Sequence, residues 1–215
     1  MTRRAESPGI FIGLAIRRTQ ADRKAQTRSA LLDATIRSLV ELGYARTTTT
    51  EIVSRASLSQ GALFKHFATK EALLAAAAAE LCASLFPRFE KAMRTHRSGK
   101  DPVERAVRGL WSVFETVEVR VLHELYAAAP TEPALKDALL PIMASHREHI
   151  HEEARDLFPE LAGANAFAPT VDLVITAMQG AALVLFADRD KAREKAFLDG
   201  LATLVRAGPL SVPAE

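Results

Sequence analysis

Residues 48–70 read TTTEIVSRASLSQGALFKHFATK, and this stretch decides the fold. The spacing of Thr48 and the glutamate three residues later matches a capping box, in which each side chain bonds the other residue's backbone amide. This signature predicts a short helix over 49–56. Ser59 is a second cap residue, and it predicts another short helix over 60–66. Two short helices joined by a tight turn form a helix-turn-helix unit.

Longer helices are predicted on both sides of this unit. The helix before it is predicted over 21–42 from apolar residues on one face, at i, i+4, i+7 and i+8: Leu32, Ile36, Leu39 and Val40. Gly43 follows this helix directly, at the C′ position where a residue with a left-handed backbone commonly ends a helix. Thr69 caps the helix that follows the unit, and Pro87 is expected to kink that helix or split it near Phe86.

The rest of the chain is also predicted to be helical. Helical periodicity and caps place five more helices, the third of them with a kink at Pro141: about 102–116, 118–128, 133–158, 169–188 and 190–206. No stretch alternates apolar and polar residues with period two over β-branched side chains. We therefore expect an all-α fold, in which an N-terminal three-helix helix-turn-helix head joins a C-terminal helical body.

Charge is distributed unevenly along the chain. The formal net charge is +2, but residues 1–70 carry +7 and the remainder carries −5. A basic front favours a polyanion as its partner. The single cysteine excludes an intrachain disulfide and indicates a reduced, cytoplasmic setting. The longest apolar stretch, Leu173 to Ala187, is shorter than the roughly 18 residues of a membrane span, so no membrane partner is expected.

The second helix of the unit carries side chains suited to reading DNA. In such a unit this helix enters the major groove with its N-terminal residues at the base edges. Gln60 can offer a bidentate amide to adenine, and Ala62 can contact a thymine methyl group. Lys65 and His66 are donors for phosphate or guanine. Thr48 and Lys70 begin helices, where free amides favour a phosphate.

Many positions of this region resemble the tetracycline-repressor-like (TetR) family of transcription regulators. The matched residues extend from about Thr27 to Leu74 and include Gly43-Tyr44, Thr47-Thr48, Glu51-Ile52, Ser59 to Gly61, His66-Phe67 and Lys70 to Leu73. The resemblance implies a homodimer with a DNA-binding head and a body that binds a small-molecule inducer and dimerises. It implies domains over 1–19 (a basic arm), 20–68 (the head) and 69–210 (the body). The DNA-contacting positions that it implies are Thr48, Thr50, Ser59, Gln60, Gly61, Ala62, Phe64, Lys65, His66 and Lys70.

The chain departs from the family pattern at two positions, one in the turn and one in the second helix. Ser57 stands where the turn usually has glycine, so a left-handed backbone there would cost roughly 1 kcal/mol. Phe64 replaces a usual tyrosine, which removes a hydroxyl-to-phosphate bond. The arm at 1–19 is either a disordered extension or a basic segment that touches DNA phosphates.

The sequence of the body indicates less about function than the sequence of the head does. The segment 171–186 is apolar nearly all round, so we expect one face to meet the core and another to meet a second copy. The alternative is a helix that is fully buried in a monomer. A stripe of mostly small residues is the candidate dimer interface: Ala177, Gly180, Ala181 and Val184.

A ligand cavity is expected between the middle helices. The candidate lining residues are mostly aromatic, and each has plain core packing as its alternative: Phe86, Phe89, Trp111, Phe114, His123, Tyr126 and Met143. His146, His149 and Glu153 share a helical stripe, which is more typical of a solvated face than of a metal site. Cys82 is expected to be a buried, inert thiol. No metal and no cofactor are expected.

The sequence therefore predicts a ligand-responsive regulator, most simply a repressor that binds a palindromic DNA operator as a homodimer and is released by an inducer. Two alternatives stay open. One is a DNA-binding chromosome-organising or division factor of the same fold without an inducer. The other is a helical enzyme, but the sequence has no Gly-rich phosphate loop, no G-x-S-x-G and no H-E-x-x-H. A continuous cavity in the body favours the regulator, whereas a filled body favours the division factor.

Overall fold

The computed structural model describes residues 19–95, 101–188 and 190–207. Within those ranges the chain is helical without a strand, which confirms the all-α prediction. In chain order the elements are α1 (Gln20–Leu42), α2 (Thr49–Ala56), α3 (Gln60–His66), α4 (Lys70–Thr95), α5 (Pro102–Phe114), α6 (Val117–Ala128), the 3-10 turn η1 (Ala129–Thr131), α7 (Pro133–Leu157), α8 (Phe167–Asp188) and α9 (Lys191–Ala207). Apart from Thr19, the predicted N-terminal arm lies outside the described residues.

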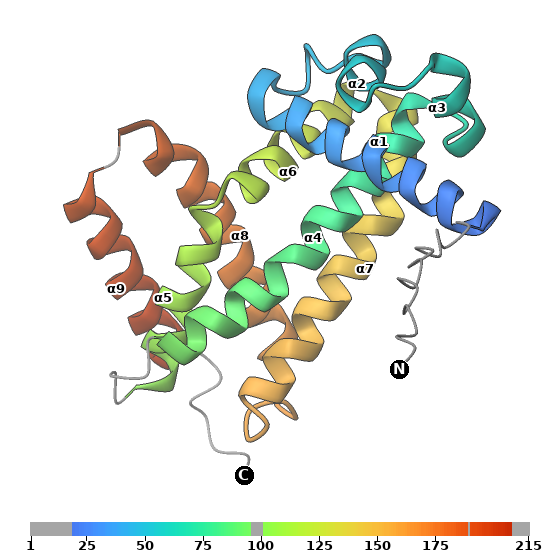
Figure 1. Cartoon of the computed structure of the whole chain (residues 1–215). Coiled ribbons are helices and arrows are strands. Elements are labelled where there is room, and N and C mark those ends of the chain that lie inside the picture. Colours follow the sequence, from blue (N-terminus) through green and yellow to red (C-terminus); the bar gives the residue numbers. More distant parts are fainter. Residues whose placement is uncertain (1–18, 96–100, 189, 208–215) are drawn as a thin grey trace, which may run out of the picture.

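Helices α1, α2 and α3 form the head at one end of the molecule, and α4 leads from it into the body beside α7 (Figure 1). The head has its own buried apolar cluster: Leu31, Leu32, Ala34, Ile52, Val53, Leu63, Phe67, Leu73 and Ala77. Leu73 and Ala77 belong to α4, while later residues of the same helix, such as Leu81 and Leu85, pack in the body. A single helix therefore contributes to both cores.

The helix caps follow the sequence with one correction. The Thr48 and Ser59 side chains accept from the amides of Glu51 and Ala62, so both cap helices as predicted. The second half of the predicted capping box is not formed, because the Glu51 carboxylate bonds Arg55 at 2.5 Å instead. The Arg55 guanidinium lies one helical turn away, and its charge-assisted hydrogen bond to the carboxylate is stronger than a bond from a neutral backbone amide.

Two internal prolines leave their helices continuous. The predicted split near Phe86 is wrong, because α4 runs through Pro87 to Thr95 as one helix. Likewise α7 runs through Pro141 as one helix. Buried neighbours on α4, including Leu81 and Leu85, pack in the body core, and such burial offsets the cost of about 3 kcal/mol that a helix-interior proline carries.

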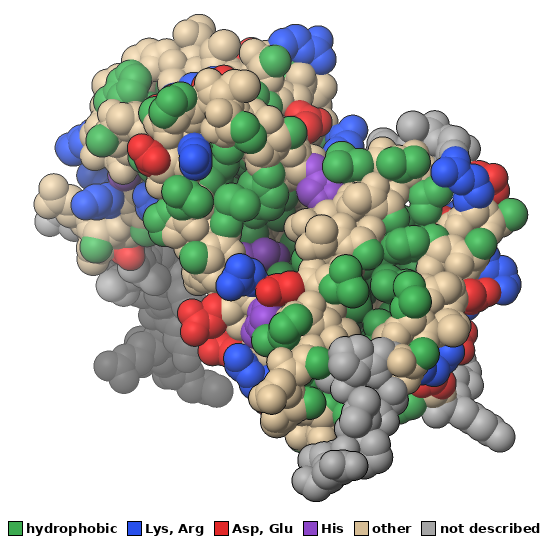
Figure 2. All heavy atoms as spheres, turned by 180° about the vertical axis from the view of Figure 1, so that it is seen from behind, with side chains coloured by type: hydrophobic (Ala, Val, Ile, Leu, Met, Phe, Trp, Pro, Cys, Tyr) green, Lys and Arg blue, Asp and Glu red, His purple; other side chains and the backbone are tan. Residues whose placement is uncertain are grey.

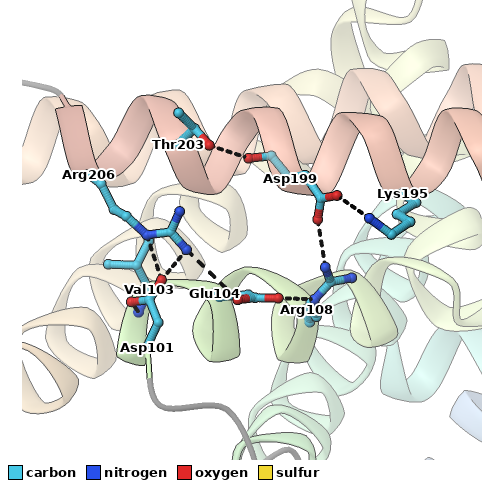
Figure 3. A network of polar contacts seen from close by, with 8 residues as sticks. All are labelled: Asp101, Val103, Glu104, Arg108, Lys195, Asp199, Thr203 and Arg206. Atoms are coloured by element: carbon cyan, nitrogen blue, oxygen red, sulfur yellow. Dashed lines mark hydrogen bonds and ion pairs between the residues drawn. The ribbon is translucent and has the colours of Figure 1, made fainter.

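Among the described residues the body has two apolar clusters. The larger joins α4, α6 and α7 and also includes Leu39 of α1 and Val113 of α5. The smaller joins α5, α8 and α9 around Trp111, Met178 and Leu198. Ion pairs fix α9 against α5, as Figure 3 shows: Arg206 pairs with Asp101, and Asp199 pairs with Arg108 at 2.7 Å. These contacts orient α9, so that its other face turns away from the core.

Two helices in the described part of the chain have the length and composition of a membrane span. They are α4 over Lys70–Arg94, which is a core helix, and α8 over Phe167–Leu185, of which only 11% is buried. Length and composition alone are weak evidence for a span, since the core helices of soluble proteins have the same properties. The open apolar surface of α8 nevertheless needs an explanation.

Candidate nucleic-acid interface and body cavity

The exposed surface of α3 and its flanks matches the predicted DNA-reading residues. Thr48, Thr50, Ser59, Gly61 and Lys65 are all exposed. Leu63 is fully buried and anchors α3 to the head core. Ala62 and His66 are half-buried.

Phe64 also lies on the outer face of α3. Phe64 is 50% exposed. The aromatic ring is thus available to contact a surface that approaches the same side of the helix as Lys65.

The turn between α2 and α3 adopts the backbone that the sequence predicted. Ser57 has φ 55° and ψ 42°, the left-handed region, and Leu58 then donates its amide to the Val53 carbonyl at 2.9 Å. Within the described ranges Ser57 is the one non-glycine residue with a positive φ. The strain of roughly 1 kcal/mol is therefore present where the family pattern has glycine.

The Gln60 side chain packs back onto α2. Its amide nitrogen donates to the hydroxyls of Thr49 and Thr50, both at 3.3 Å, so the side chain bridges α3 to α2. Its amide oxygen is buried, and no residue that the structure describes bonds it. Both bonds to the threonines are long. Rotation of the Gln60 side chain toward a DNA base therefore costs little hydrogen-bond energy.

Tyr44 connects the head to the body. Its amide donates to Glu124 of α6 at 2.9 Å, and the Lys70 ammonium lies 5.2 Å from the centre of its ring. Burial, together with a hydrogen bond to Glu132, raises the pKa of Tyr44. Gly43 before it has φ 76°, and a Cβ added there would lie 2.9 Å from Glu124 Oε2. The positive φ favours glycine at position 43, and a Cβ there would require the Glu124 carboxylate to shift.

A cavity of about 200 Å³ lies within the body. Helices α4 to α8 line it with a largely apolar wall, and α9 adds Val205. Five of the seven predicted ligand-binding residues are in this wall: Phe86, Phe89, Phe114, His123 and Tyr126. The wall also contains Phe158 and Gln179, which periodicity did not single out, and Glu153, which was expected on a solvated face.

Two predicted lining residues lie elsewhere. Trp111 packs in the cluster of α5, α8 and α9, with its ring centre 5.9 Å from that of Phe197. Met143 is 38% exposed on α7. Helical periodicity placed both on suitable helices, but it does not show which neighbour each face meets.

Two histidines bring polar atoms to this apolar wall. The Nε2 atom of His123 and the Nδ1 atom of His146 are buried, and neither has a hydrogen-bond partner among the described residues. Burial lowers the pKa of both histidines, and the neighbouring His149 lowers that of His146 further. Both rings are therefore neutral near pH 7. Unpaired buried polar atoms are costly, so these two favour a partner that is absent from the chain itself.

The remaining polar candidates of the body are structural. No group of three or more possible metal-ligating side chains occurs in the part of the chain that the structure describes. His149 instead contacts Glu152 at 3.2 Å. Cys82 is buried 3.8 Å from the Tyr126 hydroxyl, and burial raises the pKa of its thiol to about 11. Such a thiol is protonated at neutral pH.

Helix α6 touches both the cavity and the head. Its cavity side presents Val119, Leu122, His123 and Tyr126. On the other side Arg120 donates to the Val40 carbonyl at 3.2 Å, and Glu124 accepts the Tyr44 amide. Both head contacts are separated by 80 residues in sequence, so periodicity gave no sign of them.

The predicted dimer stripe on α8 is divided between two environments. Ala177 and Ala181 pack against the cluster of α5, α8 and α9, whereas Gly180 and Val184 are exposed. Leu173 and Leu183 extend the exposed side of α8, and Leu204 lies on the exposed side of α9, each more than 60% accessible. Figure 2 shows hydrophobic side chains gathered over the lobe where these helices lie, on the right in that view.

Comparisons with known proteins agree with this geometry. Residues 31–77 match the family model described as bacterial regulatory proteins, tetR family. A protein of Mycobacterium tuberculosis (strain H37Rv) described as an uncharacterized HTH-type transcriptional regulator, Rv2912c, is 34% identical over 172 residues, which is 78% of this chain and 86% of the relative.

Solved structures share the fold. A transcriptional regulator from Rhodococcus sp. Rha1 superposes with a TM-score of 0.67 at 22% identity, over 86% of this chain and 99% of that one. The multidrug binding protein EbrR, complexed with imidazole, superposes with a TM-score of 0.63 at 22% identity, over 82% of this chain and 93% of that one. The chain belongs to the tetR family of bacterial regulatory proteins, and it is a helix-turn-helix transcriptional regulator rather than an enzyme.

Proposed function

We propose that the protein is a cytoplasmic, ligand-responsive repressor that binds a palindromic operator as a homodimer and leaves it when a small molecule fills the body cavity. The observation that carries this proposal is α6, which lines the cavity on one side and bonds the head through Arg120 and Glu124 on the other. A ligand that favours one position of α6 thereby favours one position of the head. Its differential affinity for the two positions shifts their populations.

The exposed face of α8 and α9 supports the homodimer. Gly180 and Gly200 lie inside these helices, where glycine costs roughly 1 kcal/mol relative to alanine. A Cβ added at either position would meet nothing within 4 Å, so the chain's own packing does not require glycine there. Close approach of a second copy explains both glycines and covers the exposed Leu173, Leu183 and Leu204.

The head supports groove binding by α3. Exposed Ser59, Gly61, Phe64 and Lys65 lie on its outer surface, while Leu63 holds the helix from behind. Small residues at the start of α3 let the backbone approach the bases, and Lys65 can neutralise a phosphate. Two such heads, about 34–36 Å apart, would read a palindrome.

The cavity favours a regulator with an effector over a division factor without one. A body that served only for dimerisation would gain stability from filling about 200 Å³ of apolar space. EbrR, which has the same fold, is described as a multidrug binding protein and was solved with imidazole and with proflavin. The retained cavity and its two unpaired histidine nitrogens are consistent with an effector site.

A two-step screen tests the proposal. Compounds of varied charge are first ranked by the rise in melting temperature that they give the DNA-free protein. Each hit is then titrated into the complex with an operator obtained by selection from random DNA. We expect at least one cavity ligand to weaken operator binding by about fivefold or more, the usual range of allosteric coupling. Hits that stabilise the body and leave operator affinity unchanged would contradict the coupling through α6.

A further inference from the structure

The charged and polar groups of the cavity favour one sign of charge in its ligand. Among the lining residues that the structure describes, Glu153 carries the one formal charge, and no lysine or arginine is present. The Glu153 side chain is 29% exposed and lies 3.8 Å from His149, so it is only partly solvated. Six aromatic rings share the wall with it: Phe86, Phe89, Phe114, Tyr126, Phe158 and Phe167.

The two neutral histidines strengthen this preference. A neutral imidazole has one nitrogen that accepts a hydrogen bond, and both His123 and His146 bring an unpaired buried nitrogen to the wall. A ligand that donates hydrogen bonds can satisfy such nitrogens where they accept, and the neutral rings add no positive charge that would attract an anion.

A groove between α4 and α7 adjoins the cavity, and its charged wall residues are also acidic. It shares Phe86, His146 and Glu153 with the cavity, and its wall adds three more glutamates and no lysine or arginine. These are Glu90, Glu148 and Glu152. Glu90 is paired with Arg94 at 3.4 Å, and Glu152 is paired with His149, so these partners partly compensate the negative charge of the groove. Carboxylates still predominate along this route, and they attract cations and repel anions.

We infer that the cavity binds a lipophilic organic cation, with an apolar body among the aromatic rings and an ammonium-type group beside Glu153. This inference rests on the proposed function, because it assigns a ligand class to the same effector site. Aromatic faces attract cations, and the carboxylate compensates the charge that leaves water. An apolar cavity of 150 Å³ holds a benzene ring, so one of about 200 Å³, which is a third larger, fits a ring with small substituents, roughly eight to ten non-hydrogen atoms.

Three probes with one apolar body isolate the head group. They are 4-methylbenzylammonium, 4-methylbenzyl alcohol and 4-methylbenzoate, each titrated calorimetrically into the full-length, DNA-free protein at pH 7. We expect the ammonium to bind at least about fivefold tighter than the alcohol, since a partly buried ion pair contributes about 1 kcal/mol, and the benzoate to bind weakest. Tightest binding by the alcohol or the benzoate would overturn the inference, as would binding by none of the three.

Two matched variants test the role of Glu153. Glu153→Gln should weaken the ammonium by about fivefold or more and leave the alcohol within about twofold, which also shows that the variant is folded. Glu148→Gln removes a charge from the same helix but lies only on the groove, and it should change ammonium binding by less than about twofold. Equal losses for ammonium and alcohol in Glu153→Gln would overturn the assignment. Operator binding is measured separately, so a wrong ligand class and a wrong regulatory role give different results.

Discussion

Replacing Leu183 on α8 by alanine tests the proposed dimer face. The Leu183 side chain is 63% exposed in the single chain. Burying a whole leucine contributes about 1.5–3 kcal/mol, so covering two thirds of it contributes about 1–2 kcal/mol. The symmetry of a two-fold dimer counts each substitution twice, and the total loss is about 2–4 kcal/mol. The dimer dissociation constant should therefore rise by about two orders of magnitude.

Light scattering and sedimentation across a dilution series measure this change. The parent protein should have twice the chain mass of 23.4 kDa over most of the dilution series. At low concentrations where the parent is still a dimer, Leu183→Ala should already have the mass of one chain. Leu183→Glu should dissociate more completely, because it places two unpaired carboxylates in an apolar interface. Circular dichroism should show both variants folded, since exposed substitutions usually change stability by less than about 0.5 kcal/mol.

Leu140→Ala is the matched control for this experiment. Leu140 is an exposed leucine on α7, 49% accessible and outside the α8–α9 face. It should leave the dimer intact at every concentration. If Leu183→Ala kept the parent's dissociation constant while Leu140→Ala weakened the dimer, the interface would lie on another surface and the reasoning from Gly180 and Gly200 would be refuted.

Four further predictions concern the head and the buried thiol. Lys70→Ala should weaken binding to specific and random DNA alike and flatten the slope of log affinity against log salt by about one. Gln60→Ala should instead relax preference at one base pair by about 1–3 kcal/mol, and equal losses on specific and random DNA would contradict that role. Ser57→Gly should stabilise the protein by about 1 kcal/mol and raise its melting temperature by about 2–4 °C, because it relieves the left-handed serine; an unchanged or lower melting temperature would argue against stored strain. Cys82, buried with a thiol pKa of about 11, should resist iodoacetamide at pH 8 until the protein unfolds, and rapid alkylation of the folded protein would show that the thiol is accessible.

The head was largely predictable because local chemistry specifies it. The caps at Thr48 and Ser59 and the glycine at 43 each act within a few residues, and each lies where the sequence predicted it. The one wrong detail in this region, the second half of the capping box, arose from a competing neighbour. Arg55 binds the glutamate that the capping box needed.

The body was predictable as helices but only partly as a site. Apolar periodicity selected residues that face inward, yet six described helices contribute to the cavity wall, and the rotation of each helix about its axis depends on long-range packing. Trp111 and Met143 therefore turned out to face other surroundings. The contacts of Arg120 and Glu124 with the head join residues 80 positions apart, for which neither period nor spacing gives a signal.

Selection of bound fragments from random double-stranded DNA, followed by the mass of the complex on the enriched site, tests the central claim most directly. The account predicts enrichment of a sequence with two-fold symmetry, half-sites about 10–10.5 base pairs apart or a multiple of that spacing, and pairs of chains on each duplex. An unenriched pool, or an asymmetric site occupied by one chain, would contradict the claim that the helix at 60–66 enters the major groove and that a homodimer places two copies of it on the DNA.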